Sequence, residues 1–253
     1  MLRAYLGGEV FGVASGSDRP PVLALHGWGR NHRDLTTALG DIPHLAVDLP
    51  GFGTSPSPPT VWGGEDYARH LAPLLDELTL PAVVVGHSFG GRIAVHLAAT
   101  RPGAVGALVL AGVPLLHRQG RPSRPPRRFR LGKALHRLGV LSDSRMEQLR
   151  EHHGSADYRQ AHGVMRSILV KAVNESYESQ LERITCPVEL IWGDADTAAP
   201  AAIASRAESL LADARLTLIA RGDHFTPLTR PGELRAAVNR RLDAIAAAPG
   251  ELP

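Results

Sequence analysis

The sequence predicts an α/β protein with a mostly parallel central sheet, helices on both faces of that sheet, and an inserted helical cap. Short apolar segments alternate with segments of helical pattern, as in proteins built from strand, helix and strand units. The apolar segments show no period of two, which is typical of parallel strands buried on both faces. The alternation stops at Val113 and resumes at Val188, so the segment between them is expected to be an insertion.

The first part of the chain supplies most of the expected elements. Strands are expected at short apolar runs between turn signals, and helices at the longer segments that separate them. Turns rich in Gly and Pro, such as residues 50–55, mark the boundaries. In this part the expected strands are residues 10–13, 22–25, 44–48, 82–85 and 105–110, and the expected helices are residues 31–39, 64–78 and 92–99.

The inserted segment shows helical patterns and no strand signal. Its apolar residues recur at i, i+3, i+4, i+7 and i+8, which predicts an amphipathic helix over residues 156–173 with Ser155 as its N-cap. Ser144 with Glu147 three residues later indicates a second helix start. A helical cap is therefore expected over residues 113–185.

The alternation returns after the insertion. Strands are expected at residues 188–192 and 216–219, and helices at residues 201–211 and 233–248. No internal repeat is present. The α/β core is thus expected to comprise residues 1–112 and 186–253.

Composition excludes several classes of protein. The 253 residues suit one large domain or a core with an insertion, and 43% hydrophobic with 21% charged residues is ordinary for a globular protein. No apolar run is long enough to cross a bilayer. The N-terminal residues carry no pattern of a secretory signal, so a cytoplasmic location is expected. Cys186 is the single cysteine, which permits no internal disulfide.

The basic residues are concentrated in the insertion. Residues 113–185 hold 14 Lys and Arg against 7 Asp and Glu. The run from Arg118 to Arg137 is either a patch for an acidic partner or a solvated basic loop, and the loop is the favoured interpretation. The run holds one aromatic residue, Phe129, and no series of aromatic residues interleaved with the basic ones, so no nucleic-acid partner is expected.

The stretch Gly86-His87-Ser88-Phe89-Gly90 matches the pattern G-x-S-x-G between an expected strand and an expected helix. At such a turn the serine takes a strained backbone conformation, and glycines are needed where side chains would collide. The strain would direct Ser88 Oγ outward at the N-terminus of the helix, where negative charge is favoured. We therefore expect Ser88 to be a nucleophile.

A serine hydroxyl needs a base, and the base is usually a histidine oriented by a carboxylate. Asp196 and His224 each follow an expected strand, in the order Ser, Asp, His. Parallel strands end at the same edge of a sheet, so these distant residues can converge. Asp194 competes with Asp196 for the role of the acid, and Asp223 is expected to cap the loop beside His224.

These features together resemble the α/β-hydrolase superfamily over nearly the whole chain. The resemblance implies Ser88 as nucleophile, Asp196 as acid, and His224 as base. It also implies an oxyanion hole made by the backbone N–H groups of Trp28 and Phe89. The segments that carry the resemblance, in order, are His26-Gly27-Trp28-Gly29, Asp48-Leu49-Pro50-Gly51-Phe52-Gly53-Thr54-Ser55, Gly86-His87-Ser88-Phe89-Gly90-Gly91, Gly193-Asp194-Ala195-Asp196 and Gly222-Asp223-His224.

Other residues are expected around the substrate pocket. His26 is expected to brace the oxyanion loop, and His87 to pack or to form a pocket wall. Arg92 resembles the Gly-Gly-Arg of some related enzymes, although a buried structural ion pair is the favoured interpretation. The helical cap should lay an apolar face over the mouth of the site, with Val164 and three pocket residues: Met165, Ile168 and Leu169.

The expected function is that of a serine hydrolase acting on a small-molecule acyl substrate of small or medium size, with a carboxylic ester as the favoured one. Hydrolysis of C–C bonds, lactone opening, acyl transfer or elimination would use the same residues, and a slow ligand-binding receptor of this fold is a further alternative. Epoxide hydrolases and haloalkane dehalogenases resemble the fold but carry aspartate where this chain has Ser88. No cofactor and no metal are expected, because no metal-ligand spacing occurs and the adjacent His152 and His153 would not face one ligand on a helix. The oligomeric state is not predicted.

Overall fold

The computed structural model describes residues 1–117, 135–136, 142, 145 and 156–248. Within these residues, eight strands form one sheet in the order β1-β2-β4-β3-β5-β6-β7-β8. All neighbours from β4 to β8 in this order are parallel, whereas β1 and β2 add an antiparallel edge. The strands are β1 (Arg3–Tyr5), β2 (Val10–Ser15), β3 (Val22–Leu25), β4 (His44–Asp48), β5 (Ala82–His87), β6 (Val105–Ala111), β7 (Val188–Gly193) and β8 (Ala214–Ile219).

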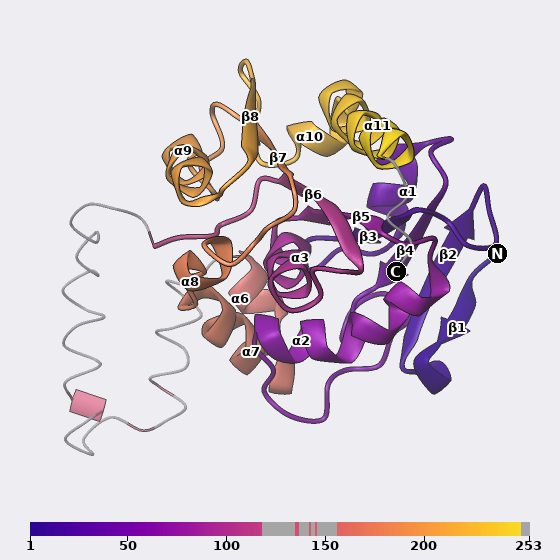
Figure 1. The fold of residues 1–253 in the computed structure, drawn as a ribbon. Coiled ribbons are helices and arrows are strands. Elements are labelled where there is room, and N and C mark those ends of the chain that lie inside the picture. Colours follow the sequence, from indigo (N-terminus) through magenta and orange to yellow (C-terminus); the bar gives the residue numbers. More distant parts are fainter. Residues whose placement is uncertain (118–134, 137–141, 143–144, 146–155, 249–253) are drawn as a thin grey trace.

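Helices cover both faces of this sheet, with α1 and α11 on one side and α2 and α3 on the other (Figure 1). The described α-helices are α1 (Arg33–Leu39), α2 (Gly64–Leu71), α3 (Phe89–Thr100), α6 (Ala156–Gln160), α7 (Gly163–Val173), α8 (Glu178–Leu181), α9 (Ala201–Leu210), α10 (Thr226–Thr229) and α11 (Gly232–Ala247). Short 3₁₀ helices form at η1 (Leu6–Gly8) and η2 (Ala72–Glu77).

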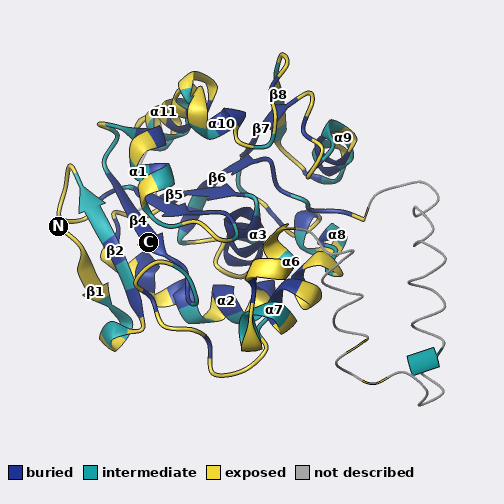
Figure 2. Cartoon of the chain, turned by 180° about the vertical axis from the view of Figure 1, so that it is seen from behind, coloured by how far each residue is buried: buried dark blue, intermediate teal, exposed yellow. Residues whose placement is uncertain are grey.

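The strands supply residues to two hydrophobic cores, one on each face. In β5, Val83 and Val85 belong to the core under α1 and α11, and Val84 belongs to the opposite core. Because both cores are apolar, side chains alternate between faces without any alternation of polarity in the sequence. Figure 2 shows the buried residues along the central strands and the exposed residues on the outer sides of the helices. The predicted fold class is confirmed.

Two expected helices are interrupted within their predicted bounds. The segment 64–78 forms α2 and then η2, because Pro73 cannot donate the N–H that would continue the α-helix. The expected continuous helix over residues 156–173 is wrong. It divides into α6 and α7, and between them His162 is extended and Gly163 has a φ of 54°. The strand β1 and the helix α10 were not expected.

The described part of the insertion carries α6, α7 and α8, which lie beside α2 and α3 (Figure 1). The Tyr177 backbone N–H donates to the Leu115 carbonyl at 3.0 Å, which joins the last described part of the insertion to its first residues. Several features singled out in the sequence lie outside the described residues. They are Ser155, the helix start signalled by Ser144 and Glu147, the pair His152 and His153, and most of the basic run. The division into core and cap therefore stays a prediction.

None of the described helices is long and apolar enough to cross a membrane.

Candidate active site

Ser88 lies at a sharp turn between the central strand β5 and the helix α3. Its backbone has a φ of 48° and a ψ of −112°, which is strained for a residue with a side chain. A Cβ built on Gly90 would lie 2.1 Å from the Leu25 carbonyl oxygen, and one built on Gly86 would lie 2.4 Å from the Gly91 Cα. Only glycine fits at these two positions, so the sequence of the turn itself imposes the conformation of Ser88.

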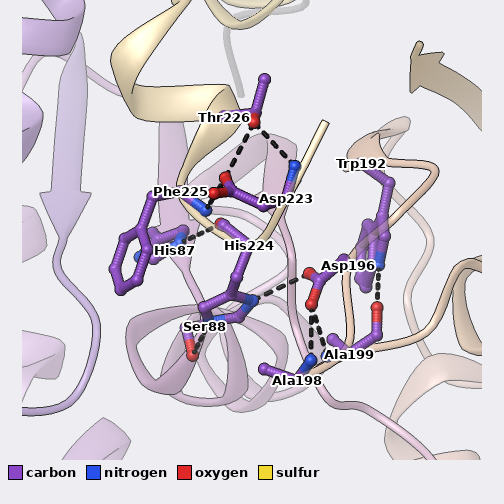
Figure 3. Close-up of polar contacts among 10 residues, drawn as sticks. All are labelled: His87, Ser88, Trp192, Asp196, Ala198, Ala199, Asp223, His224, Phe225 and Thr226. Atoms are coloured by element: carbon purple, nitrogen blue, oxygen red, sulfur yellow. Dashed lines mark hydrogen bonds and ion pairs between the residues drawn. The ribbon is translucent and has the colours of Figure 1, made fainter. Parts of the chain in front are cut away.

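Three side chains from the carboxyl edge of the sheet form a continuous hydrogen-bonded chain (Figure 3). The Nε2 atom of His224 lies 3.0 Å from Ser88 Oγ. The Nδ1 atom of the same ring lies 2.8 Å from Asp196 Oδ2. Because a carboxylate accepts, Nδ1 carries the hydrogen and Nε2 presents its lone pair to the serine hydroxyl. This arrangement can remove a proton from Ser88 and hold it on His224.

Asp196, and not Asp194, reaches the histidine. Asp196 is buried at the end of the loop after β7, and its Oδ1 accepts hydrogen bonds of 2.8 Å from the backbone N–H groups of Ala198 and Ala199. Asp194 is exposed. Asp223 accepts hydrogen bonds from the Thr226 hydroxyl at 2.8 Å and the Phe225 N–H at 3.0 Å, so it caps the loop as expected.

Trp28 and Phe89, the expected oxyanion donors, line the same cavity as Ser88. Phe89 is the first residue of α3, whose N-terminal N–H groups have no partner within the helix. Trp28 lies in the loop after β3, and its ring contacts the Phe89 ring edge to face at 5.2 Å between centroids. The N-terminus of α3 adds a potential that favours negative charge beside Ser88, and the role of the two N–H groups as oxyanion donors stays a prediction.

His26 holds the loop that carries Trp28. Its Nδ1 donates to the Gly27 carbonyl at 2.7 Å, and its Nε2 accepts from the Leu49 N–H at 2.9 Å. Burial lowers the pKa of His26 to about 4, although several weaker interactions act in the opposite direction. A neutral ring is required here, since only a neutral imidazole can donate and accept at once. The side chain does not line the cavity, so it is a brace between two loops.

A cavity of about 710 Å³ opens over Ser88. Of the expected pocket residues, His87, Arg92 and Leu169 line it. Met165 and Ile168 do not: Ile168 is completely buried in the hydrophobic core, and the Met165 side chain packs against Gly51. The wall residues that sequence reasoning missed include Arg30, Pro114, Asp157, Ala172, Val173, Thr197, Ala198 and Phe225.

The spacing around Leu169 could have indicated two of these wall residues. Ala172 and Val173 follow Leu169 by three and four positions, so they share its face of α7. The wall is thus made by the last turn of α7, one turn later than the expected roof. The expected roof was displaced because Met165 packs against Gly51 and Ile168 is buried in the hydrophobic core.

Arg92 links the helix of the nucleophile to this wall. It is 6% exposed, and its Nη1 donates to the Ala172 carbonyl near the C-terminus of α7. Its guanidinium carbon lies 5.8 Å from the centroid of the Tyr177 ring. The favoured ion pair is not formed with any carboxylate of the described residues. The C-terminal end of a helix and the face of an aromatic ring stabilise the buried cation instead.

Among the residues that the structure describes, no group of three or more His, Cys, Asp or Glu side chains is arranged to hold a metal ion.

Known proteins resemble this chain over different lengths. A family model described as "Alpha/beta hydrolase family" matches residues 22–237. The lipase LipV of Mycobacterium tuberculosis is 48% identical over 93 residues, which cover 35% of this chain and 35% of the relative. An esterase of the same organism is 40% identical over 115 residues, which cover 42% of this chain and 37% of the relative. This chain therefore spans about a third of the length of these curated relatives.

Solved structures support the fold. The crystal structure of a bacterial membrane phospholipase A superposes with a TM-score of 0.72 and 21% identity, covering 98% of this chain and 86% of that one. At this identity the likeness concerns the fold alone. The family resemblance drawn from the sequence motifs is confirmed by the family match.

Proposed function

Since the chain belongs to the alpha/beta hydrolase family, we propose that it is a serine hydrolase that cleaves a small or medium carboxylic ester through an acyl-enzyme on Ser88. The observation that carries the proposal is the hydrogen-bonded chain from Asp196 through His224 to Ser88 beneath an open cavity. Two relatives named as a lipase and an esterase support the choice of an ester as substrate.

In the first half of the proposed reaction, Ser88 Oγ attacks the ester carbonyl carbon while His224 Nε2 takes the hydroxyl proton. Negative charge then develops on the carbonyl oxygen, and the N–H groups of Trp28 and Phe89 donate to it. Each such donor is worth about 3 to 4 kcal/mol in the transition state, because it meets charge only as charge forms. Asp196 stabilises the positive imidazolium of His224 in the same step.

In the second half, the C–O bond to the alcohol breaks and the His224 proton passes to the leaving oxygen. The acyl group remains bonded to Ser88 Oγ. Water then attacks this acyl-enzyme, with His224 accepting a proton from the water and returning it to Ser88. The products are the alcohol and the carboxylic acid, and the three side chains return to their starting protonation states.

The cavity wall suits an acyl chain. Leu169, Ala172 and Val173 present apolar surface to the space above Ser88. Burial of apolar substrate groups there would contribute about 0.8 kcal/mol for each methylene that leaves water. Arg30, Arg92 and Asp157 line other parts of the same cavity, so only the acyl part of the proposed ester is taken to be apolar.

Turnover of a p-nitrophenyl ester panel, from acetate to decanoate, tests this proposal. Wild-type protein should hydrolyse at least the short esters, and Ser88→Ala should lower kcat/KM to the background level while its unfolding midpoint stays unchanged. Hydrolysis by Ser88→Ala at the wild-type rate would contradict the proposal. Tight ester binding without turnover would instead favour the receptor alternative, and product formation without an acyl-enzyme would favour elimination.

A further inference from the structure

His87 lies where three segments of the candidate site meet. It is the last residue of β5, it is bonded directly to Ser88, and it is 1% exposed. Its Nε2 lies 3.1 Å from the backbone carbonyl oxygen of His224. A Cβ built on Gly27 would lie 2.8 Å from the His87 Nδ1, so the ring packs directly against the loop that carries Trp28. One side chain thus contacts the segments of the nucleophile, the base and the oxyanion donor.

The hydrogen bond to His224 defines the protonation of this ring. A carbonyl oxygen only accepts, so the His87 Nε2 must carry the hydrogen. Burial and the neighbouring His224 lower the pKa of His87 to about 4, against the weaker effects of Asp34 and Asp196, so the ring is neutral at pH 7. Its Nδ1 then has no hydrogen, and this atom has no hydrogen-bond partner among the described residues. Among the described residues, the His87 ring therefore makes its hydrogen bond through Nε2, to the backbone carbonyl of His224.

That contact restrains the base at the point where its side chain leaves the backbone. The His224 carbonyl and the Phe225 N–H belong to one peptide group, and two side chains hold it: Asp223 accepts from the N–H at 3.0 Å, and His87 donates to the carbonyl. A base that shifts by about 1 Å can lose two orders of magnitude in rate. The orientation of the His224 peptide group therefore affects how closely the His224 ring approaches Ser88 Oγ.

We propose that His87 is a positioning residue for the base, because its Nε2–H holds the His224 carbonyl and keeps the His224 Nε2 3.0 Å from Ser88 Oγ. The inference rests on the proposed function, since it gives His87 a part in the same reaction. It also explains why a histidine, and not an apolar residue, stands before Ser88. An apolar side chain would fill the same volume but would leave the carbonyl without its donor.

Three variants separate this role from packing. His87→Gln keeps an N–H at nearly the distance of the imidazole Nε2, His87→Met matches the length of Gln without a donor, and His87→Asn ends one bond short. We expect His87→Gln to retain kcat within about threefold of wild type, whereas His87→Met and His87→Asn should lose about 10-fold to 100-fold in kcat with little change in KM. The unfolding midpoints of all three variants identify any variant that fails to fold. If His87→Met fails to fold, the comparison of His87→Gln with His87→Asn tests the role.

The rate at which a fluorophosphonate labels Ser88 provides a second readout that needs the base but no ester. The proposal predicts the same order of rates, with His87→Gln near wild type and the other two slower. Equal rates for Gln, Met and Asn, or a change confined to KM, would overturn it in favour of a packing or wall role. If wild-type protein is labelled but hydrolyses no ester, the proposed function fails, and the labelling rates still test the role of His87.

Discussion

At the scale of single residues, both oxygens of Asp196 are occupied by donors. The Ala198 and Ala199 N–H groups bind Oδ1, and the His224 ring binds Oδ2. This leaves the carboxylate one orientation, and it fixes which nitrogen of His224 faces Ser88. The acid is therefore positioned by the local turn after β7 as well as by the histidine.

Substitution of Asp196 tests its assignment as the acid that orients His224. Asp196→Asn should lower kcat by about three to four orders of magnitude, because the amide can hold His224 in the wrong tautomer and cannot compensate its charge. Asp194→Asn, an exposed carboxylate two residues away, is the matched control and should stay within about threefold of wild type. Steady-state kinetics with one p-nitrophenyl ester measures both, and reversed effects would make Asp194 the acid.

At the scale of elements, the end of α7 forms the cavity wall and the start of α7 packs into the core region. Sequence periodicity located the apolar face of this helix, but the contact of Met165 with Gly51 comes from tertiary packing. For the same reason periodicity could not show that Arg92 would bind the end of a helix instead of a carboxylate. Contacts between distant elements carry no local signal.

The wall assignment predicts a change in chain-length preference. Leu169→Ala enlarges the cavity over Ser88, so kcat/KM should shift toward longer acyl chains, by about 0.8 kcal/mol for each additional methylene that becomes buried. Met165→Ala, one turn earlier on the same helix, does not alter the lining and should keep the wild-type profile. The measurement is kcat/KM across p-nitrophenyl esters of increasing length. The same shift in both variants, or a shift only in Met165→Ala, would place the wall elsewhere.

At the scale of the whole molecule, the order of elements in the sequence was enough to predict the sheet and the convergence of Ser88, Asp196 and His224 at one edge. This was possible because parallel strands all end on that edge, so position after a strand determines position in space. The antiparallel edge strand β1 was not predicted, because its three residues are mostly exposed and carry no apolar run. The wall residues Pro114 and Phe225 could not be predicted, because their places depend on how separate layers pack.

Two buried neutral histidines make the stability of the whole fold sensitive to acid. Burial lowers the pKa values of His26 and His87 to about 4, so the unfolded chain binds their protons first as the pH falls below 6.5. The free energy of unfolding should therefore decrease between pH 6.5 and 4, by up to about 3 kcal/mol for each ring. Chemical denaturation across this range measures it. His26→Gln should make the loss of unfolding free energy between pH 6.5 and 4 smaller. The control His162→Gln changes an exposed histidine and should leave this loss as in wild type. Identical pH profiles for wild type and His26→Gln would contradict the account.

The central claim is that Ser88 is a nucleophile activated by His224, and site-resolved labelling with a fluorophosphonate tests it most directly. Peptide mass spectrometry of the labelled protein should find one phosphonyl group, on Ser88, and His224→Gln should slow its formation by at least about 100-fold because the base is lost. Ser88→Ala should carry no label. Labelling at another residue, or labelling of Ser88 at an unchanged rate in His224→Gln, would contradict the account.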